Sequence, residues 1–129
     1  MKTIMIYGHP HPELSLGNKT ILETVKAEIP DMDVRHIAEL YSDGKFDIKA
    51  EQEALAAADT IILQFPVYWY AYPALLKKYI DDVFAHGFAY GSTGTRLKGK
   101  TLIVSCTTGA PYDAYAEGEF QSHTMDTYM

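Results

Sequence analysis

The sequence lacks the residues that would tie it to a disulfide framework, a polyanion or a membrane. Its single cysteine, Cys106, cannot form an internal disulfide, and such sparing use of cysteine is typical of a reducing compartment. Acidic residues outnumber Lys and Arg by 17 to 11, and the net charge of −6 argues against nucleic acid or an anionic membrane as a partner. No apolar run is long enough to span a bilayer, and the run nearest the N-terminus is too short for a signal peptide. These absences predict a cytoplasmic protein without membrane insertion.

Several catalytic signatures are also missing. The dinucleotide fingerprint Gly-x-Gly-x-x-Gly and the serine-hydrolase elbow Gly-x-Ser-x-Gly do not occur, and we expect no nucleoside triphosphatase of the P-loop kind. His9 and His11 could form a metal-binding pair, but prolines flank them and no third ligand has a suitable spacing, so no metal site is predicted. Cys106 ends an apolar run, where a thiol is expected to be an inert core residue and not a nucleophile.

Short apolar runs alternate with amphipathic stretches along the whole chain. Strands are predicted at residues 4–7, 34–37, 60–65 and 101–106, and helices after residue 18, over 49–58 and over 73–84. This order predicts a single α/β domain, residues 1–129, with an open parallel sheet and helices on both faces. The second strand suits a sheet edge, whereas the third and fourth suit burial on both faces. Pro73 is expected to begin the last helix, and Gly87 to cap it.

Three predicted strands end in loops rich in glycine, proline, hydroxyl and aromatic residues. We call them the first loop (residues 8–18), the second loop (residues 66–72) and the third loop (residues 107–115). Because the strands are parallel, all three loops should lie on one rim of the sheet, where ligands bind in open α/β folds. The first loop leads into a helix, whose free N–H groups attract anions. With His9, Ser15 and Asn18 as further donors it suits a phosphate, although Ser15 could serve only as a helix cap.

The second loop concentrates aromatic rings, with Tyr68, Trp69, Tyr70 and Tyr72 within five residues. Such a loop favours a flat, partly apolar ligand, though Trp69 could equally be a core residue. The third loop offers backbone amides around Gly109. A phosphate site without a nucleotide fingerprint, facing a loop rich in rings, indicates FMN or its longer relative FAD.

These motifs together resemble those of one protein family. Gly8-His9-Pro10, residues 64–70, residues 73–77, residues 87–91 and Thr107-Thr108-Gly109 follow the order of the NAD(P)H:quinone oxidoreductases, which are flavodoxin-like proteins. The bacterial branch of that family includes general stress proteins and the ancillary quinone reductases of potassium-efflux systems. The resemblance covers nearly the whole chain and implies a flavodoxin-like fold. Because family members continue with a further helix, strand and helix, it also implies that this chain is C-terminally truncated.

The resemblance further implies a site and its chemistry. A homodimer would bind one flavin per subunit near its interface, and NAD(P)H and then a quinone would react there in a ping-pong mechanism. Tyr115 matches a family tyrosine near the reacting centre, whereas the histidine that assists it has no counterpart in register, since His123 is displaced. The residues implied to hold the phosphate are His9, Ser15, Leu16, Gly17 and Asn18; those implied to line the ring are Pro66, Val67, Tyr68, Trp69 and Tyr70; those implied at its pyrimidine edge are Thr107, Thr108, Gly109 and Ala110. Ala110 stands where the family often has a second glycine.

Other functions stay open at this point. The chain could be a regulatory subunit that docks on a potassium-efflux transporter, a one-electron carrier of the flavodoxin kind, or a truncated form with impaired flavin binding. FMN is favoured over FAD because the chain is short and no adenine pocket is evident. The sequence does not distinguish NADH from NADPH as the donor.

Overall fold

The described residues fold around one parallel four-stranded sheet with the strand order β2-β1-β3-β4. The computed structural model describes residues 1–111 and 114. Its elements are β1 (Thr3–Tyr7), η1 (Pro12–Leu14), α1 (Gly17–Glu28), β2 (Asp33–His36), α2 (Ile37–Leu40), α3 (Ile48–Ala57), β3 (Thr60–Pro66), α4 (Ala74–Val83) and β4 (Thr101–Thr107). The predicted fold class, an open parallel α/β sheet of the flavodoxin-like kind, is confirmed. None of the described helices combines the length and the apolar character that crossing a bilayer requires.

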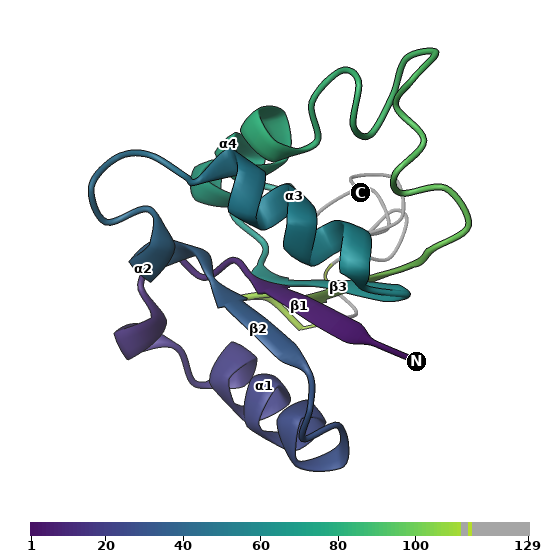
Figure 1. The fold of residues 1–129 in the computed structure, drawn as a ribbon. Helices are drawn as coiled ribbons and strands as arrows, with labels where there is room; N and C mark the ends of the chain where they lie inside the picture. Colours follow the sequence, from purple (N-terminus) through teal and green to yellow (C-terminus); the bar gives the residue numbers. More distant parts are fainter. Residues whose placement is uncertain (112–113, 115–129) are drawn as a thin grey trace.

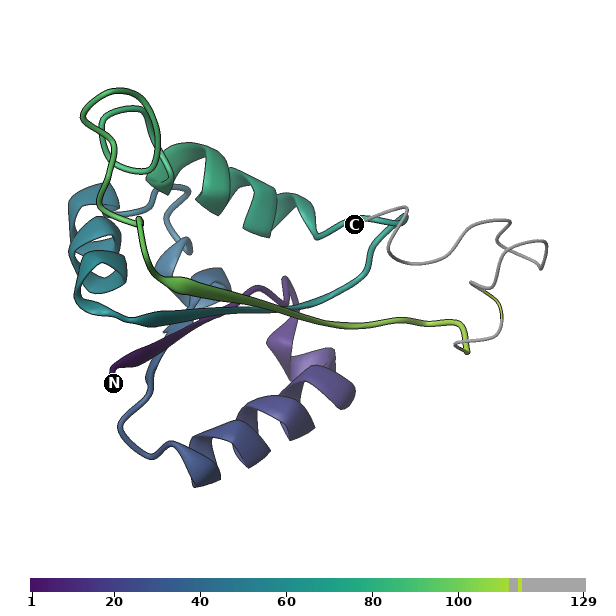
Figure 2. The ribbon, with the colours of Figure 1, turned by 90° about the vertical axis from the view of Figure 1, so that its right-hand side faces the viewer.

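The helices form a layer on each side of the sheet. Helix α1 covers one face, and α3 and α4 cover the other (Figures 1 and 2). The larger apolar cluster lies between the sheet and α3 and α4, and includes Ile4, Leu55, Phe65, Leu76 and Tyr79. The smaller cluster, Met5, Tyr7, Met32 and Ile62, has the partly buried Leu22 and Val25 of α1 packed against it. Strands β1 and β3 are therefore buried from both sides, as continuous apolar runs in parallel sheets usually are.

The burial predicted for β4 is wrong. Leu102, Ile103 and Val104 are between 44% and 56% exposed. The reason is position: among the described residues β4 pairs only with β3 and is the outermost strand of the sheet. An apolar run rich in β-branched residues indicates a strand that could be buried. Whether it is buried depends on the strands and helices that lie against it.

Element boundaries also differ in detail from the predicted ones. Pro73 is the N-cap of α4 and not its first residue, and the helix ends in a C-cap at Phe84. Gly87 lies beyond that cap in the left-handed region, with φ of 82°. Ile37 opens the short helix α2, which sequence patterning did not predict, and its side chain is fully buried. The edge position predicted for the second strand is confirmed, since β2 is the outermost strand beside β1.

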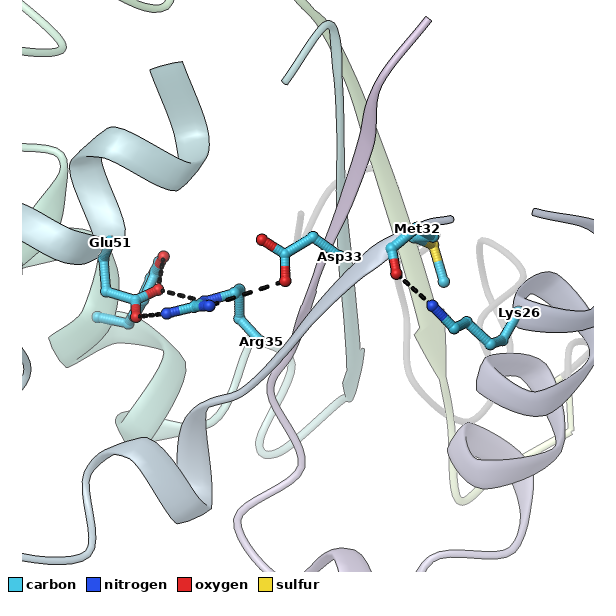
Figure 3. A network of polar contacts seen from close by, with 6 residues as sticks. Lys26, Met32, Asp33, Arg35 and Glu51 are labelled. Atoms are coloured by element: carbon cyan, nitrogen blue, oxygen red, sulfur yellow. Dashed lines mark hydrogen bonds and ion pairs between the residues drawn. The ribbon is translucent and has the colours of Figure 1, made fainter. Parts of the chain in front are cut away.

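A buried ionic cluster ties β2 to α3 and α4 (Figure 3). Arg35 donates through Nε to Glu51 Oε2 at 3.0 Å and through Nη2 to Glu51 Oε1. The Tyr79 hydroxyl donates to the same Oε2 at 3.0 Å, and Asp33 lies 3.7 Å from Arg35 Nη1. Burial, followed by the Glu51 charge, raises the pKa of Tyr79, so its hydroxyl remains a donor. The bidentate geometry and the third donor satisfy a carboxylate that is almost completely removed from water.

We expect Arg35→Met to destabilise the fold strongly, because it leaves the Glu51 carboxylate buried without its counter-charge. Loss of one partner from a buried pair should lower the free energy of unfolding by about 3 kcal/mol, measured by urea denaturation. Lys77→Met, which breaks the exposed i,i+4 pair with Asp81, is the control and should leave the transition midpoint nearly unchanged. Equal effects of the two substitutions would contradict the structural role of the cluster.

Candidate functional site

The three loops meet at the carboxyl ends of the parallel strands. In Figure 2 the N-terminal end of α1 lies on the same side of the molecule as the ends of β3 and β4. Two hydrogen bonds join the loops directly, and another joins the first loop to β3. Gly8 N donates to Gln64 O at 2.8 Å, Val67 N donates to Thr107 O at 2.8 Å, and Asn18 Nδ2 donates to Thr107 Oγ1 at 2.9 Å. The rim is therefore one connected structure and not three separate loops.

A chain of side-chain hydrogen bonds, which we call the polar relay, runs beneath the rim through Gln64, Asn18 and Thr107. Gln64 Nε2 donates to Asn18 Oδ1 at 2.8 Å, and Asn18 in turn donates to Thr107. Gln64 is fully buried and Asn18 is 3% exposed. The described residues provide no partner for Gln64 Oε1. Buried polar groups are normally paired, so a glutamine placed here carries a cost that packing alone does not explain.

Sequence reasoning did not select Gln64 as a site residue. The available signal was its position, because it is the one amide in the apolar strand β3. A polar side chain in the centre of a strand that is covered on both faces needs a partner, and that need could have drawn attention to it.

The first loop presents the N-terminal turn of α1 at the rim. Ser15 Oγ accepts from Lys19 N at 3.2 Å, so Ser15 pairs one N–H of the first turn from the position before the N-cap, which is Leu16. The first N–H groups of any helix lack partners within it, and those of Gly17 and Asn18 are in this position here. Gly17 also lies close to the third loop, since a Cβ added to it would come within 3.3 Å of Thr107 Cγ2. Leu16 is mostly exposed.

His9 is a neutral hydrogen-bond donor on the inner side of the first loop. Its side chain is buried, and its Nδ1 accepts from His11 N at 2.9 Å, which leaves the ring proton on Nε2. Burial lowers the pKa of His9 below the ordinary 6.5, the neighbouring His11 lowers it further, and Glu13 opposes both. The ring lies edge-on to Tyr68, with centroids 6.5 Å apart, so the first and second loops are in contact.

The second loop is a strained turn with an exposed ring at its tip. Tyr68 and Ala71 exchange two backbone hydrogen bonds, and the central residues Trp69 and Tyr70 have φ of 49° and 64°. Positive φ at both central positions is typical of a type I′ turn, where Asn-Gly is the usual pair. Trp69 is 92% exposed, so the alternative that it is a core residue is wrong. Pro66 is buried at the end of β3, and Val67 and Tyr70 are partly buried.

The third loop begins at Thr107, the last residue of β4. Thr108 Oγ1 donates to Ala110 O at 2.8 Å and holds the loop in a tight bend. Among the described residues, none comes within 4 Å of a Cβ added to Gly109. Tyr115, the predicted catalytic residue, lies outside the described residues. Cys106 precedes this loop, and burial raises the pKa of its thiol, which disfavours the reactive thiolate.

A motif of another class occurs in the chain but in the wrong structural setting. Residues 94–101 match Gly-x-x-x-x-Gly-Lys-Thr, the P-loop pattern. The argument against a nucleoside triphosphatase therefore cannot be that the motif is absent. A P-loop connects a strand to the N-terminus of a helix, whereas this segment leads into strand β4. Lys100 Nζ donates to Ala56 O at 2.9 Å and also to Ala58 O, so it serves the fold. Context excludes the P-loop.

The cavities that described residues line do not mark the rim. An open groove of about 710 Å³ lies between α1 and β2 and is lined by residues such as Leu22, Lys26 and Val34. A second cavity of about 350 Å³ continues it toward Ser15. Neither is lined by a ring of the second loop or by Thr107, so the polar contacts locate the candidate site.

The rim residues fit a ligand with a phosphate and a planar ring. The helix N–H groups, the Ser15 hydroxyl and the neutral His9 provide donors without a fixed positive charge. The exposed Trp69 and the partly exposed Tyr68 provide aromatic surface beside them. The buried relay ends at the Thr107 hydroxyl, at the end of β4.

Comparison with known proteins relates the whole chain to one family. Residues 1–129 match the family whose members have a flavodoxin-like fold. The glutathione-regulated potassium-efflux system ancillary protein KefF of Enterobacter sp. (strain 638) is 49% identical over 106 residues, which are 82% of this chain and 60% of that protein. The chain thus spans less than two thirds of the length of this relative.

Two solved structures are similar over almost all of the chain. General stress protein 14 of Treponema denticola, solved in complex with FMN, has a TM-score of 0.93 and 32% identity over 99% of this chain and 74% of that one. An NADPH-quinone reductase from P. pentosaceus has a TM-score of 0.84 and 30% identity over 100% of this chain and 73% of that one.

The strain in the second loop predicts the effect of two substitutions at one position. Trp69→Gly relieves the positive φ and removes a ring that buries almost nothing, whereas Trp69→Ala keeps the strain. The glycine variant should therefore have a free energy of unfolding about 1 kcal/mol higher than the alanine variant. Urea denaturation of both measures the difference. A less stable glycine variant would show that the turn is not strained.

The burial of His9 predicts a specific pH dependence. Because its pKa in the folded state lies below 6.5, the unfolded chain binds more protons between these two values. The free energy of unfolding should therefore fall as the pH is lowered through this window. His9→Gln cannot titrate and should give a flatter curve there, measured by urea denaturation at a series of pH values. Parallel curves for the original chain and for His9→Gln would contradict a lowered pKa of His9 in the folded state.

Proposed function

This chain belongs to the family of proteins with the flavodoxin-like fold, and from that membership we propose that it binds FMN and transfers electrons from NAD(P)H to a quinone. The predicted resemblance to the NAD(P)H:quinone oxidoreductases, with their general stress and potassium-efflux branches, is confirmed at the level of the family. The observation that carries the proposal is the hydrogen bond from Asn18 to Thr107, because it joins an anion-binding helix terminus to the third loop beside an exposed aromatic turn.

The first loop holds the phosphate in this proposal. The N–H groups of Leu16, Gly17 and Asn18 at the start of α1, together with the Ser15 hydroxyl and His9 Nε2, donate to its oxygens. The helix dipole adds a partial positive charge at the same point. The phosphate is the terminal group of FMN, whereas in FAD it continues to an adenosine. We therefore favour FMN as the ligand, with FAD as the alternative.

The second and third loops hold the ring. Pro66, Val67, Tyr68, Trp69 and Tyr70 line its face, and Thr107, Thr108, Gly109 and Ala110 meet its pyrimidine edge. When bound, the flavin supplies two-electron chemistry between a nicotinamide donor and a quinone acceptor. The chain orients the ring, shields one face from water and places neutral donors along the edge where charge develops. Tyr115 comes near the reacting centre by resemblance to the family.

The remaining assignments follow the same resemblance. Residues 1–129 act as one flavin-binding domain in the cytoplasm, and two copies form a homodimer. A second candidate function is that of a regulatory subunit docked on a potassium-efflux transporter. It is favoured by the 49% identity to a protein named as an ancillary part of such a system.

Reconstitution with FMN tests the proposal. The 129-residue chain should bind FMN with a change in its visible spectrum, and the complex should oxidise NADPH in the presence of a quinone. Trp69→Ala should weaken FMN binding about tenfold through loss of ring contact, while Trp69→Phe keeps most of the affinity. A chain that folds but binds no flavin would contradict the proposal. Binding without reduction by either NADH or NADPH would favour a one-electron carrier or a regulatory role.

A further inference from the structure

All donors of the polar relay point the same way. Gln64 donates to Asn18, and Asn18 donates to Thr107, so the proton of each amide is directed toward the rim. Thr107 Oγ1 already accepts from Asn18 Nδ2, which is a donor and cannot take a proton in return. The Thr107 hydroxyl must therefore direct its own proton away from the relay. Thr107 is partly exposed at the rim, whereas the two amides behind it are buried.

The relay resists reversal because of its position. For Thr107 to donate inward, the amides of Asn18 and Gln64 would both have to flip within a buried site. The backbone is fixed as well, since Thr107 O accepts from Val67 N and Gly8 N donates to Gln64 O. In a chain of hydrogen bonds with one direction, each bond polarises the next, so the terminal hydroxyl becomes a better donor.

We propose that the Gln64–Asn18–Thr107 relay holds the Thr107 hydroxyl as a directed donor to an acceptor atom of the bound flavin ring, and thereby favours the reduced flavin over the oxidised one. The inference rests on the proposed function. Reduced flavin carries more negative charge on the ring, and a hydrogen bond to a charged acceptor is about twice as strong as a neutral one. Thr107 contacts the cofactor, while Asn18 and Gln64 are positioning residues that act through it.

The test compares the affinity for oxidised FMN with the affinity for reduced FMN under anaerobic conditions. Thr107→Val removes the hydroxyl at nearly constant shape and should weaken the reduced form about tenfold more than the oxidised form. Thr107→Ser keeps the hydroxyl and is the matched control, with a ratio close to that of the original chain. Gln64→Met lies away from the ligand and should shift the ratio in the same direction by a smaller factor.

The double variant separates a relay from general damage. If Gln64 acts through Thr107, Thr107→Val with Gln64→Met should have the ratio of Thr107→Val alone. A merely structural role would weaken both forms equally, and independent roles would give multiplied effects; either result overturns the inference.

An unchanged ratio in Thr107→Val would mean that the hydroxyl donates inward, which also overturns the inference. If Thr107→Val does not fold, Thr107→Ala replaces it. A native chain that binds neither form overturns the proposed function, and with it this inference.

Discussion

The hydrogen bond between Asn18 and Thr107 is the contact on which the arrangement of the rim depends. It joins residues 89 positions apart and brings the N-terminal turn of α1 against the end of β4. Parallel topology places the loops on one side of the sheet, but it leaves their relative height and orientation undetermined. The Asn18 side chain fixes them, because it is buried and is held from below by Gln64. Without this anchor, the helix terminus and the third loop would be neighbours with no defined geometry between them.

The ionic cluster of Arg35, Glu51 and Tyr79 performs a similar task on the opposite face. It connects the edge strand β2 to α3 and α4, where few apolar contacts are available to α3 beyond Leu55 and its alanines. The two polar systems share no residue, and they lie on opposite faces of the sheet. Changes at the rim can therefore leave the packing of β2 intact, which allows the fold and the candidate site to vary independently.

The sequence was sufficient for the order of the four described strands and the longer helices, though not for α2, and for the shared location of the loops. Apolar runs and turn residues are local signals, and parallel topology converts them into one rim. The relay could not be predicted in the same way. Gln64 pairs with Asn18, which is distant in the sequence, and the residues next to Gln64 in the chain give no indication of that partner. Exposure was equally hidden, since Trp69 and the apolar residues of β4 have the composition of core residues. Residues 94–101 show the opposite case. They match the P-loop sequence pattern, but the match does not indicate a phosphate site, because the strand and helix that a P-loop connects are not arranged around it.

Several unfavourable features gather at the rim. Gln64 Oε1 is buried without a partner among the described residues, Trp69 and Tyr70 have positive φ, and the Trp69 ring is almost fully in water. The unpaired oxygen and the positive φ values each cost on the order of 1 kcal/mol, the exposed ring contributes almost no buried surface, and none of these features helps the fold. Strain and exposed aromatic surface are expected where a protein is shaped for a ligand and not for itself. The ionic cluster on the far face has its carboxylate fully satisfied, whereas these unfavourable features lie at the edge where a ring and a phosphate would offset them.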